Sequence, residues 1–319
     1  GMVVLTPERG FFLTDFRYRE QSKAEVRGLK VMVYDTGLEE VLLLALRGRD
    51  GMRIGFDPTS QTYGEVMAMR RWLKGIAKLA PLKGSMAMLR ARKSPGEVQI
   101  IKEGVRVAQQ AFREALGGLG AGESEEDFAL RLDMAGRKRG AEDRSFETIV
   151  AGGTRGAVVH ASPARRRMGG VTVVDWGVVH RGYHTDTTRT VAFGKAPPSL
   201  RKAHALVLEA QERAMEAVKP GIKARGVDRA ARKVIEEAGY GPFFGHGLGH
   251  GVGLEVHERP HVGQASGDVL EEGMVFTIEP GIYLPGKGGV RVEDMVLVTA
   301  HGAEFLTTLP RTLDPSDYV

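Results

Sequence analysis

The chain has 319 residues, of which 42% are apolar and 27% charged, which suits a globular protein with two domains, and its lack of cysteine excludes disulfides, thiolate metal sites and cysteine nucleophiles. The formal net charge is +5, but the basic residues are scattered apart from residues 165–167 and no basic recognition helix is present, so we expect no nucleic-acid partner. No apolar run approaches the roughly 20 residues that span a bilayer, and the N-terminus lacks a signal-peptide pattern, so we expect a cytoplasmic protein with no membrane contact.

Residues 1–92 are predicted to form a small α/β domain. Short apolar runs bounded by turn residues predict strands at residues 3–5, 11–14, 29–34 and 52–56. The first two of these flank a Pro-Glu-Arg-Gly turn and should pair as a hairpin. Strong helix formers predict helices at residues 38–47 and 63–73, and turn-forming residues follow at 80–84.

A second domain is predicted over residues 93–319. Its first helix should begin at Ser94, because serine is a preferred N-cap, Pro95 suits the first helical position and Glu97 completes a capping box. Apolar residues then recur with helical spacing. A further helix is predicted over residues 124–140.

The two-helix pattern of this domain occurs twice. Gly122 lies between the first two helices and Gly140 ends the second, while Gly221 and Gly239 stand at the equivalent places 99 residues further along. Each helix pair precedes a strand-rich region, residues 146–193 in the first half and 275–306 in the second. The sequence therefore predicts two related α-α-β halves whose sheets lie together, with helices outside and a cleft between them.

Two aspartates interrupt the apolar strands of the first half. Residues 171–178 and 183–193 predict strands joined by a turn at 180–182, and they carry Asp175 and Asp186. A buried carboxylate must be paired or must bind a cation, and across an antiparallel hairpin these two positions can face each other. Two such carboxylates raise each other's pKa unless a metal ion neutralises them.

The second half repeats the pattern, because its predicted strands at 275–283 and 289–299 carry Glu279 and Glu293. Four of the nine histidines lie just before these strands, within residues 243–261: His246, His250, His257 and His261. Glycines alternate through this segment, which lets the backbone approach a ligand closely and does not suit an ordinary helix. Histidines clustered near four strand-borne acids favour a functional site.

Two aspartates, two glutamates and a histidine form an oxygen-rich ligand set for two divalent cations. Ligands of this kind, without sulfur, favour Mn²⁺, with Co²⁺, Fe²⁺ or Zn²⁺ as alternatives. Two such ions a few ångströms apart activate a bridging water and polarise a carbonyl group, which are the requirements of amide hydrolysis. The residue types therefore predict a dinuclear metal centre with hydrolytic chemistry.

Six short motifs in the second domain resemble those of the pita-bread metallopeptidases, the family of methionine aminopeptidase, aminopeptidase P and prolidase. They are D-W-G at 175–177, G-Y-H-T-D-T-T-R-T at 182–190, H-G-L-G-H at 246–250, V-H-E at 256–258, E-P-G at 279–281 and V-R-V-E-D at 290–294. The resemblance covers residues 94–300. It implies an α+β protein whose pita-bread catalytic domain has two pseudo-symmetric α-α-β halves. The sequence LTPERGFFLTDFRYREQ also resembles the N-terminal domain of the proline-specific members, in a shorter, truncated form.

The resemblance implies a role for each candidate site residue. Asp175, Asp186 and Glu293 would hold one metal ion, and the other would be held by Asp186, Glu293, His250 and Glu279. Glu279 would also take the proton of the attacking water. The remaining candidates lie around the substrate: His160 on the substrate-facing wall, His246 and His257 as donors to the scissile carbonyl and its oxyanion, and Arg291, two residues before Glu293 on the same strand face, as the group that orients the carboxylates.

Within this family the sequence favours the proline-specific branch, because it has the extra N-terminal domain, the T-R-T sequence and all five ligands. The expected activity is that of an Xaa-Pro dipeptidase acting on small peptides, in a homodimer. Aminopeptidase P activity on longer peptides is the alternative, and a non-catalytic binding module is the third possibility.

Many prolidases hold the substrate carboxylate with an arginine four residues after the equivalent of His257. His261 stands there, with Arg259 two residues before it, so Arg47 or Arg49 is expected to replace this clamp.

Overall fold

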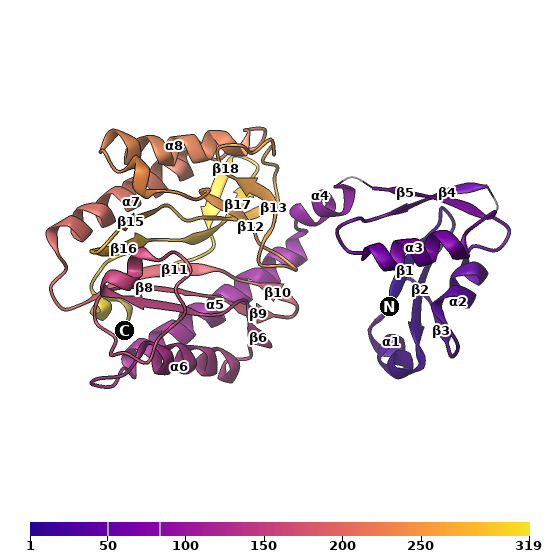
Figure 1. The fold of residues 1–319 in the computed structure, drawn as a ribbon, viewed down its shortest axis with the longest axis horizontal. Helices are drawn as coiled ribbons and strands as arrows, with labels where there is room; N and C mark the ends of the chain where they lie inside the picture. Colours follow the sequence, from indigo (N-terminus) through magenta and orange to yellow (C-terminus); the bar gives the residue numbers. More distant parts are fainter. Residues whose placement is uncertain (50, 83) are drawn as a thin grey trace. The chain divides into compact units, whose positions relative to one another are not determined.

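The computed structural model describes residues 1–49, 51–82 and 84–319, and the chain divides into two compact units, Gly1–Met86 and Ala87–Val319 (Figure 1). Among the described residues, no helix is both long enough and apolar enough to cross a membrane.

The first unit packs two small sheets against helices. One sheet has the order β1 (Met2–Leu5), β2 (Gly10–Asp15), β3 (Lys30–Tyr34), and the other pairs β4 (Met52–Phe56) with β5 (Ala77–Pro81) in parallel. β1 and β2 form the predicted antiparallel hairpin, and β3 runs parallel to β2. The helices are η1 (Phe16–Tyr18), α1 (Arg19–Glu25), α2 (Leu38–Ala45) and α3 (Tyr63–Trp72). Their core contains Phe11, Leu13, Leu42 and Leu73.

The predicted strands and helices of this unit are confirmed, but η1, α1 and β5 were not predicted. α1 is polar along most of its length, so it carries little periodic signal. The turn expected at residues 80–84 is wrong at its start, because Ala80 and Pro81 end β5. Lys83, also part of that prediction, lies outside the described residues.

The boundary between the two units falls within α4 (Ser85–Ala91). The second unit contains the two predicted helix pairs, α5 (Pro95–Gly117) with α6 (Glu125–Lys138), and α7 (Pro198–Ala217) with α8 (Ala224–Glu237). Ser94 and Ser124 each form a complete capping box at the start of α5 and α6. Four glycines at equivalent places have positive φ angles of 85°, 97°, 86° and 83°, namely Gly122, Gly140, Gly221 and Gly239. Gly140 and Gly239 directly follow the C-caps of α6 and α8, and Gly122 and Gly221 lie in the turns before these helices, so the internal repeat extends to the backbone conformation at both places.

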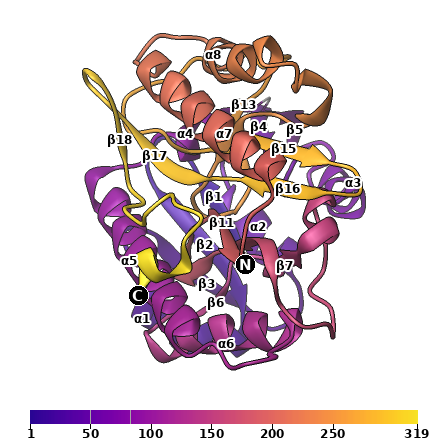
Figure 2. The same cartoon turned by 90° about the vertical axis from the view of Figure 1, so that its left-hand side faces the viewer.

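The strands of this unit lie between the helix pairs, with α5 and α6 on one side and α7 and α8 on the other (Figures 1 and 2). The first half supplies a sheet with the order β11 (Thr187–Phe193), β8 (Gly170–Trp176), β7 (Ile149–Gly152), and a smaller sheet of β10 (Tyr183–His184), β9 (Val178–His180) and β6 (Asp143–Arg144). The second half supplies β13 (Glu258–Val262), β12 (Gly249–Gly251), β14 (Val275–Ile278), β17 (Asp294–Thr299) and β18 (Gly302–Phe305), and the pair β15 (Gly281–Leu284) and β16 (Gly288–Arg291). The pita-bread architecture is confirmed.

The two halves meet at the centre of the strand layer. An isolated antiparallel bridge joins Thr188 to Glu293, whose backbone N–H donates to the Thr188 carbonyl over 3.1 Å. Behind β8, the Trp176 ring stacks on Phe112 of α5 with centroids 4.2 Å apart, and its indole N–H donates to the Ala108 carbonyl. Buried aromatic packing of this kind fixes the strand that carries Asp175.

The prediction that each acid occupies the interior of a strand is wrong for three of them. Asp175 belongs to β8, but Asp186 precedes β11, Glu279 lies between β14 and β15, and Glu293 lies between β16 and β17. Asp175 pairs with Thr188, so it does not stand directly opposite Asp186.

Local chemistry explains these breaks. Pro280 has no N–H to continue a strand ladder after Glu279. Gly177 breaks the first strand where the backbone passes so close that a Cβ atom would lie 1.9 Å from the Thr185 carbonyl oxygen. We expected Arg291 to share a strand face with Glu293. That prediction is wrong, because β16 ends at Arg291. The breaks leave Asp186, Glu279 and Glu293 between strands, and their side chains line one cavity together with that of Asp175.

Candidate metal centre

A cavity of about 440 Å³ lies within the second unit, and all nine candidate site residues line it: His160, Asp175, Asp186, His246, His250, His257, Glu279, Arg291 and Glu293. Further wall residues come from the segment Phe146 to Ile149 and from Val159 to Pro163. The structure therefore brings together side chains from β8, from the residue before β11, from the glycine-rich segment (residues 243–261), and from the connections between β14 and β15 and between β16 and β17.

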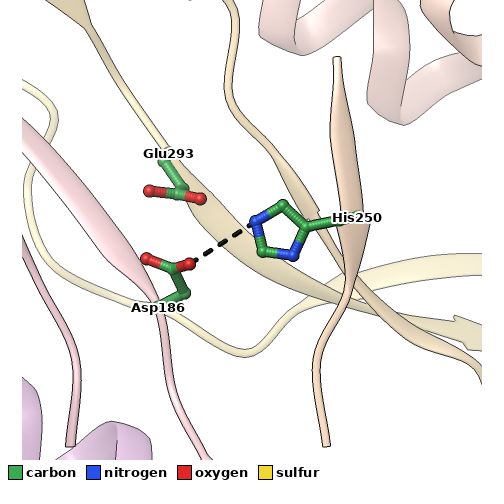
Figure 3. Close-up of side chains that lie close together, drawn as sticks. All are labelled: Asp186, His250 and Glu293. Carbon is green, nitrogen blue, oxygen red and sulfur yellow. Dashed lines mark ion pairs between the residues drawn. The ribbon is translucent and has the colours of Figure 1, made fainter. Parts of the chain in front are cut away.

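Asp186, His250 and Glu293 form the tightest group in this cavity. Each offers one ligand atom, and these atoms lie within 4.8 Å of one another. Figure 3 shows the two carboxylates facing the ring of His250, whose Nε2 is 3.5 Å from Asp186 Oδ2. The same Nε2 is 3.5 Å from Glu279 Oε1, so Glu279 adjoins the group.

The carboxylates crowd one another in a poorly solvated place. Burial raises the pKa of Asp186 well above its ordinary value, and the neighbouring charge of Glu293 raises it further. Burial likewise raises the pKa of Glu293, with Glu279 as the next contribution. Burial raises the pKa of Glu279 to about 8. A group of acids in this state is stabilised in its charged form by bound cations.

The donor atoms fit such cations. Asp175 Oδ1 and Asp186 Oδ1 are buried, and neither has a hydrogen-bond partner among the described residues. Burial lowers the pKa of His250 to about 4, which keeps the ring neutral, as a metal ligand must be. Its Nδ1 lies 3.1 Å from the Gly251 carbonyl, so Nε2 is the nitrogen that faces the acids. Carboxylate and imidazole donors without sulfur suit divalent ions such as Mn²⁺.

Arg291 joins the acids of the two halves. Its guanidinium donates to Asp175 Oδ2 over 2.6 Å, to the Thr188 hydroxyl over 3.1 Å and to the Tyr283 hydroxyl over 2.9 Å. The Thr188 hydroxyl in turn donates to Glu293 Oε2 over 2.7 Å. Arg291 is only 3% exposed, so it is no surface arginine.

Sequence reasoning missed Thr188 and Tyr283. Thr188 falls within the T-R-T sequence that was used only to choose a family branch, so a signal for it was present. Tyr283 sits in an apolar strand, β15, where nothing distinguishes it from a core residue.

The other histidines differ in how they are held. His246 Nε2 lies 2.9 Å from the Tyr283 hydroxyl and its Nδ1 lies 2.8 Å from the Gly247 carbonyl, so both ring nitrogens have partners. His257 and His160 are exposed on the cavity wall. The ring centroids of His257 and His250 are 4.2 Å apart.

The side chains considered for a substrate carboxylate clamp each have their own surroundings. Arg259 forms an ion pair with Asp268, and the backbone N–H of His261 donates to the same carboxylate over 2.8 Å. In the first unit, Arg49 pairs with Glu8 over 2.5 Å and Arg47 is exposed. Among the described residues lining the cavity, the arginine is Arg291, and its donors already serve other groups.

Comparison with known proteins defines the class. Residues 99–300 match metallopeptidase family M24, and residues 1–92 match the creatinase/prolidase N-terminal domain. The chain belongs to metallopeptidase family M24.

Its relatives narrow the class further. The chain is 36% identical to an Xaa-Pro dipeptidase of Pyrococcus horikoshii, over 98% of this chain and 88% of that protein. Among solved structures, the Xaa-Pro dipeptidase from Bacillus anthracis superposes with a TM-score of 0.92 at 36% identity, covering 98% of this chain and 88% of the other. An X-Pro aminopeptidase from Thermotoga maritima superposes with a TM-score of 0.91 at 35% identity, covering 97% and 88%. The family predicted from the motifs is thereby confirmed.

Proposed function

We propose that this chain is a metal-dependent Xaa-Pro dipeptidase, a hydrolase that cuts the bond between a residue and a following proline in dipeptides. One observation carries the proposal: Asp175, Asp186, His250, Glu279 and Glu293, drawn from separate segments, all line one cavity. Proline specificity is supported by the relatives named above, which match nearly the whole chain.

The ligand set suits two divalent ions, with Mn²⁺ as the favoured metal. Asp175, Asp186 and Glu293 would hold one ion, while His250 and Glu279 would join Asp186 and Glu293 at the other. When bound, such ions supply activation of a water molecule and polarisation of a carbonyl group. The unpartnered oxygens of Asp175 and Asp186 and the raised pKa values of the other acids support this assignment.

The chain's own groups handle the proton and the substrate carbonyl. Glu279 faces the cavity beside His250 and takes the proton of the attacking water. His257 presents an exposed ring on the cavity wall, from which it donates a hydrogen bond to the scissile carbonyl oxygen, and His160 lies on the wall that faces the substrate. His246, whose Nε2 lies 2.9 Å from the Tyr283 hydroxyl, would be the second donor to the scissile carbonyl and its oxyanion, and Arg291 keeps Asp175 and Glu293 oriented.

Aminopeptidase P activity on longer peptides is the second candidate. The observation in its favour is that the cavity presents no uncommitted arginine, among the described residues, for the free carboxylate of a dipeptide. A structural neighbour named as an X-Pro aminopeptidase supports the same alternative. A non-catalytic binding module is the least supported, because all five ligand residues are present.

The test compares Ala-Pro with Ala-Pro-Ala as substrates, after chelation and again after addition of Mn²⁺. A dipeptidase cleaves Ala-Pro with the higher kcat/KM, whereas an aminopeptidase P prefers the tripeptide. If the fully metallated protein hydrolyses neither Ala-Pro nor Ala-Pro-Ala, both proposed activities are ruled out.

Three further expectations belong to this proposal. We expect domains at residues 1–92 and 93–319, which the extents of the two family matches support. We also expect a homodimer in the cytoplasm. Light scattering after gel filtration measures the dimer, and cell fractionation measures the compartment.

A further inference from the structure

The segment that carries His246 has little intrinsic rigidity. Glycine occupies positions 245, 247, 249, 251 and 253, and glycine backbone loses more conformational freedom on folding than any other. Within residues 245–253, the described strand is β12, Gly249–Gly251. Something outside the segment must therefore hold the residues around His246.

A buried ion pair on α8 makes those contacts. Arg232 Nε and Nη2 donate to the two carboxylate oxygens of Asp228 over 2.9 and 2.8 Å, four residues earlier on the same helix. The side chains are 8% and 1% exposed. Such a forked pairing fixes the plane and direction of the guanidinium.

Three of the remaining hydrogen bonds of the pair go to residues 244–248, and the Gln264 amide oxygen accepts a further one from Arg232 Nε over 2.9 Å. Arg232 Nη1 donates to the Phe244 carbonyl over 2.9 Å, and Nη2 donates to the carbonyl of His246 itself over 2.8 Å. Asp228 Oδ1 accepts a hydrogen bond from the Leu248 backbone N–H over 3.1 Å. The pair therefore reaches the backbone before, at and after His246.

The same guanidinium also acts on the rings. It lies over the Phe244 ring, 4.1 Å from the centroid, and the Phe244 ring meets the His246 ring edge to face at 5.1 Å. On its other side, His246 contacts the Tyr283 hydroxyl that Arg291 holds. His246 is thus placed from the helix side by Arg232 and from the cavity side by Tyr283.

We propose that the Asp228–Arg232 pair is a positioning pair, whose role is to hold His246 at the cavity wall rather than to stabilise α8. A buried ion pair adds little net stability compared with apolar side chains of similar volume, whereas most of the other contacts of this pair reach the backbone and the Phe244 ring on either side of His246. The catalytic consequence rests on the proposed function, but the placement of His246 does not.

The experiment uses Arg232→Met and Arg232→Lys in the full chain. Lysine keeps a charge for Asp228 but cannot make the fork and both carbonyl contacts at once. Lys233→Met is the matched control, since Lys233 forms an exposed i,i+4 pair with Glu237 on the same helix, at 3.6 Å. Ile235→Val, buried on α8, controls for a loss of stability without a loss of hydrogen bonds.

Two readouts separate placement from function. The first is the ¹⁵N spectrum of histidine-labelled, chelator-treated protein, with the His246 signals assigned through His246→Gln. The second is kcat and KM for Ala-Pro with Mn²⁺. Arg232→Met should move the His246 signals and lower kcat about 10- to 100-fold, Arg232→Lys should do so less, and both control variants should leave the signals unchanged.

Unmoved His246 signals together with a kcat within about twofold of the wild type in Arg232→Met would overturn the proposal. If that variant does not fold, the same result in Arg232→Lys overturns it. If the wild-type protein cleaves neither Ala-Pro nor Ala-Pro-Ala, the proposed function fails while the shift of the His246 signals still decides whether Arg232 positions His246.

Discussion

Arg291 Nη2 donates to Asp175 Oδ2 over 2.6 Å, with both side chains buried in the strand layer. Asp175 belongs to the first half of the repeat and Arg291 to the second, so one hydrogen bond joins the acid sets of both halves. The other donors of the guanidinium reach Thr188, which holds Glu293, and Tyr283, which contacts His246.

Arg291→Lys should therefore weaken metal binding and catalysis together. A lysine ammonium cannot contact three groups in the directions that a guanidinium does, so Asp175 and Glu293 lose their common support. We expect Mn²⁺ affinity and kcat/KM each to fall about 10- to 100-fold, measured by calorimetry and by Ala-Pro hydrolysis. Arg131→Lys, which alters a forked pair with Glu123 outside the cavity, is the control. Unchanged Mn²⁺ affinity in Arg291→Lys would remove the support we assign to it.

Gln211 should be a second support of the metal ligands. Its buried amide Nε2 on α7 donates to the Ile278 carbonyl over 3.1 Å, to the Val292 carbonyl over 3.4 Å and to Asp294 Oδ2 over 3.0 Å. The two carbonyls belong to the residues directly before Glu279 and Glu293. Gln211→Leu should lower Mn²⁺ affinity by about 10-fold, because outer hydrogen-bond partners orient the ligands.

Gln109→Leu provides the comparison for this variant. Gln109 is a buried glutamine on α5 whose side-chain oxygen accepts from the Thr308 backbone N–H and hydroxyl, and among the described residues its side chain forms no hydrogen bond to a residue adjoining a predicted ligand. The Gln109→Leu variant should lose about as much stability as Gln211→Leu while keeping the Mn²⁺ affinity of the wild type. Equal affinity losses in the two variants would mean that Gln211 acts only through general stability.

The stability of chelator-treated protein should fall as the pH rises. Burial raises the pKa of Glu279 to about 8 from its ordinary value of 4.5, so between these pH values the folded protein retains a proton that the unfolded chain has released. Stability from this group is thus fully present below pH 4.5 and is lost as the pH approaches 8. Burial lowers the pKa values of His246 and His250 to about 4, so the stability that depends on these two rings rises with pH between about 4 and 6.5, opposite to the effect of Glu279.

Glu279→Gln tests the glutamate, since both proteins share these histidines, and it also removes the charge that raises the pKa of Glu293, which acts in the same direction. Urea unfolding from pH 5 to pH 8 should show the variant gaining stability over the wild type as the pH rises. A difference that is flat or shrinks with pH would mean that Glu279 is already ionised in the folded protein.

The ion pair between Lys93 and Glu258 should matter for stability. Lys93 Nζ is 2.5 Å from Glu258 Oε1, and the two side chains are 1% and 5% exposed. Lys93→Met leaves the carboxylate with Arg90 alone, and breaking a buried pair costs about 3–5 kcal/mol. Lys102→Met, which breaks an exposed pair with Glu304, should cost less than about 1 kcal/mol. Chemical denaturation measures both, and equal losses would show that burial of the pair is unimportant.

The sequence was most informative where residue types were chemically distinctive. Acids in apolar surroundings and histidines among glycines pointed to the residues that line the cavity, and the repeated glycines located the helix ends at Gly140 and Gly239. These signals are local in the sequence, so they can be recognised without knowledge of the fold. Gly177 and Pro280 also carried a local signal for the strand breaks, and it was not used.

The remaining features depend on contacts between distant parts of the chain. Tyr283 and Gln211 look like ordinary core positions, and their hydrogen bonds to the site arise only once α7 and β15 pack against the second sheet. Arg232 likewise looks like one more basic residue on a helix, since its partners Phe244 and His246 are set by how α8 lies against the glycine-rich segment. Pattern and spacing do not encode such directions.

The central claim is that Asp175, Asp186, His250, Glu279 and Glu293 together hold divalent ions that hydrolysis requires. Its most direct test is calorimetric titration of Mn²⁺ into chelator-treated protein, with Ala-Pro turnover followed in parallel. We predict two bound ions per chain and turnover that appears only as they bind, with both lost in Asp186→Asn/Glu293→Gln. Full turnover in exhaustively chelated protein, or unchanged Mn²⁺ binding in that double variant, would contradict the account.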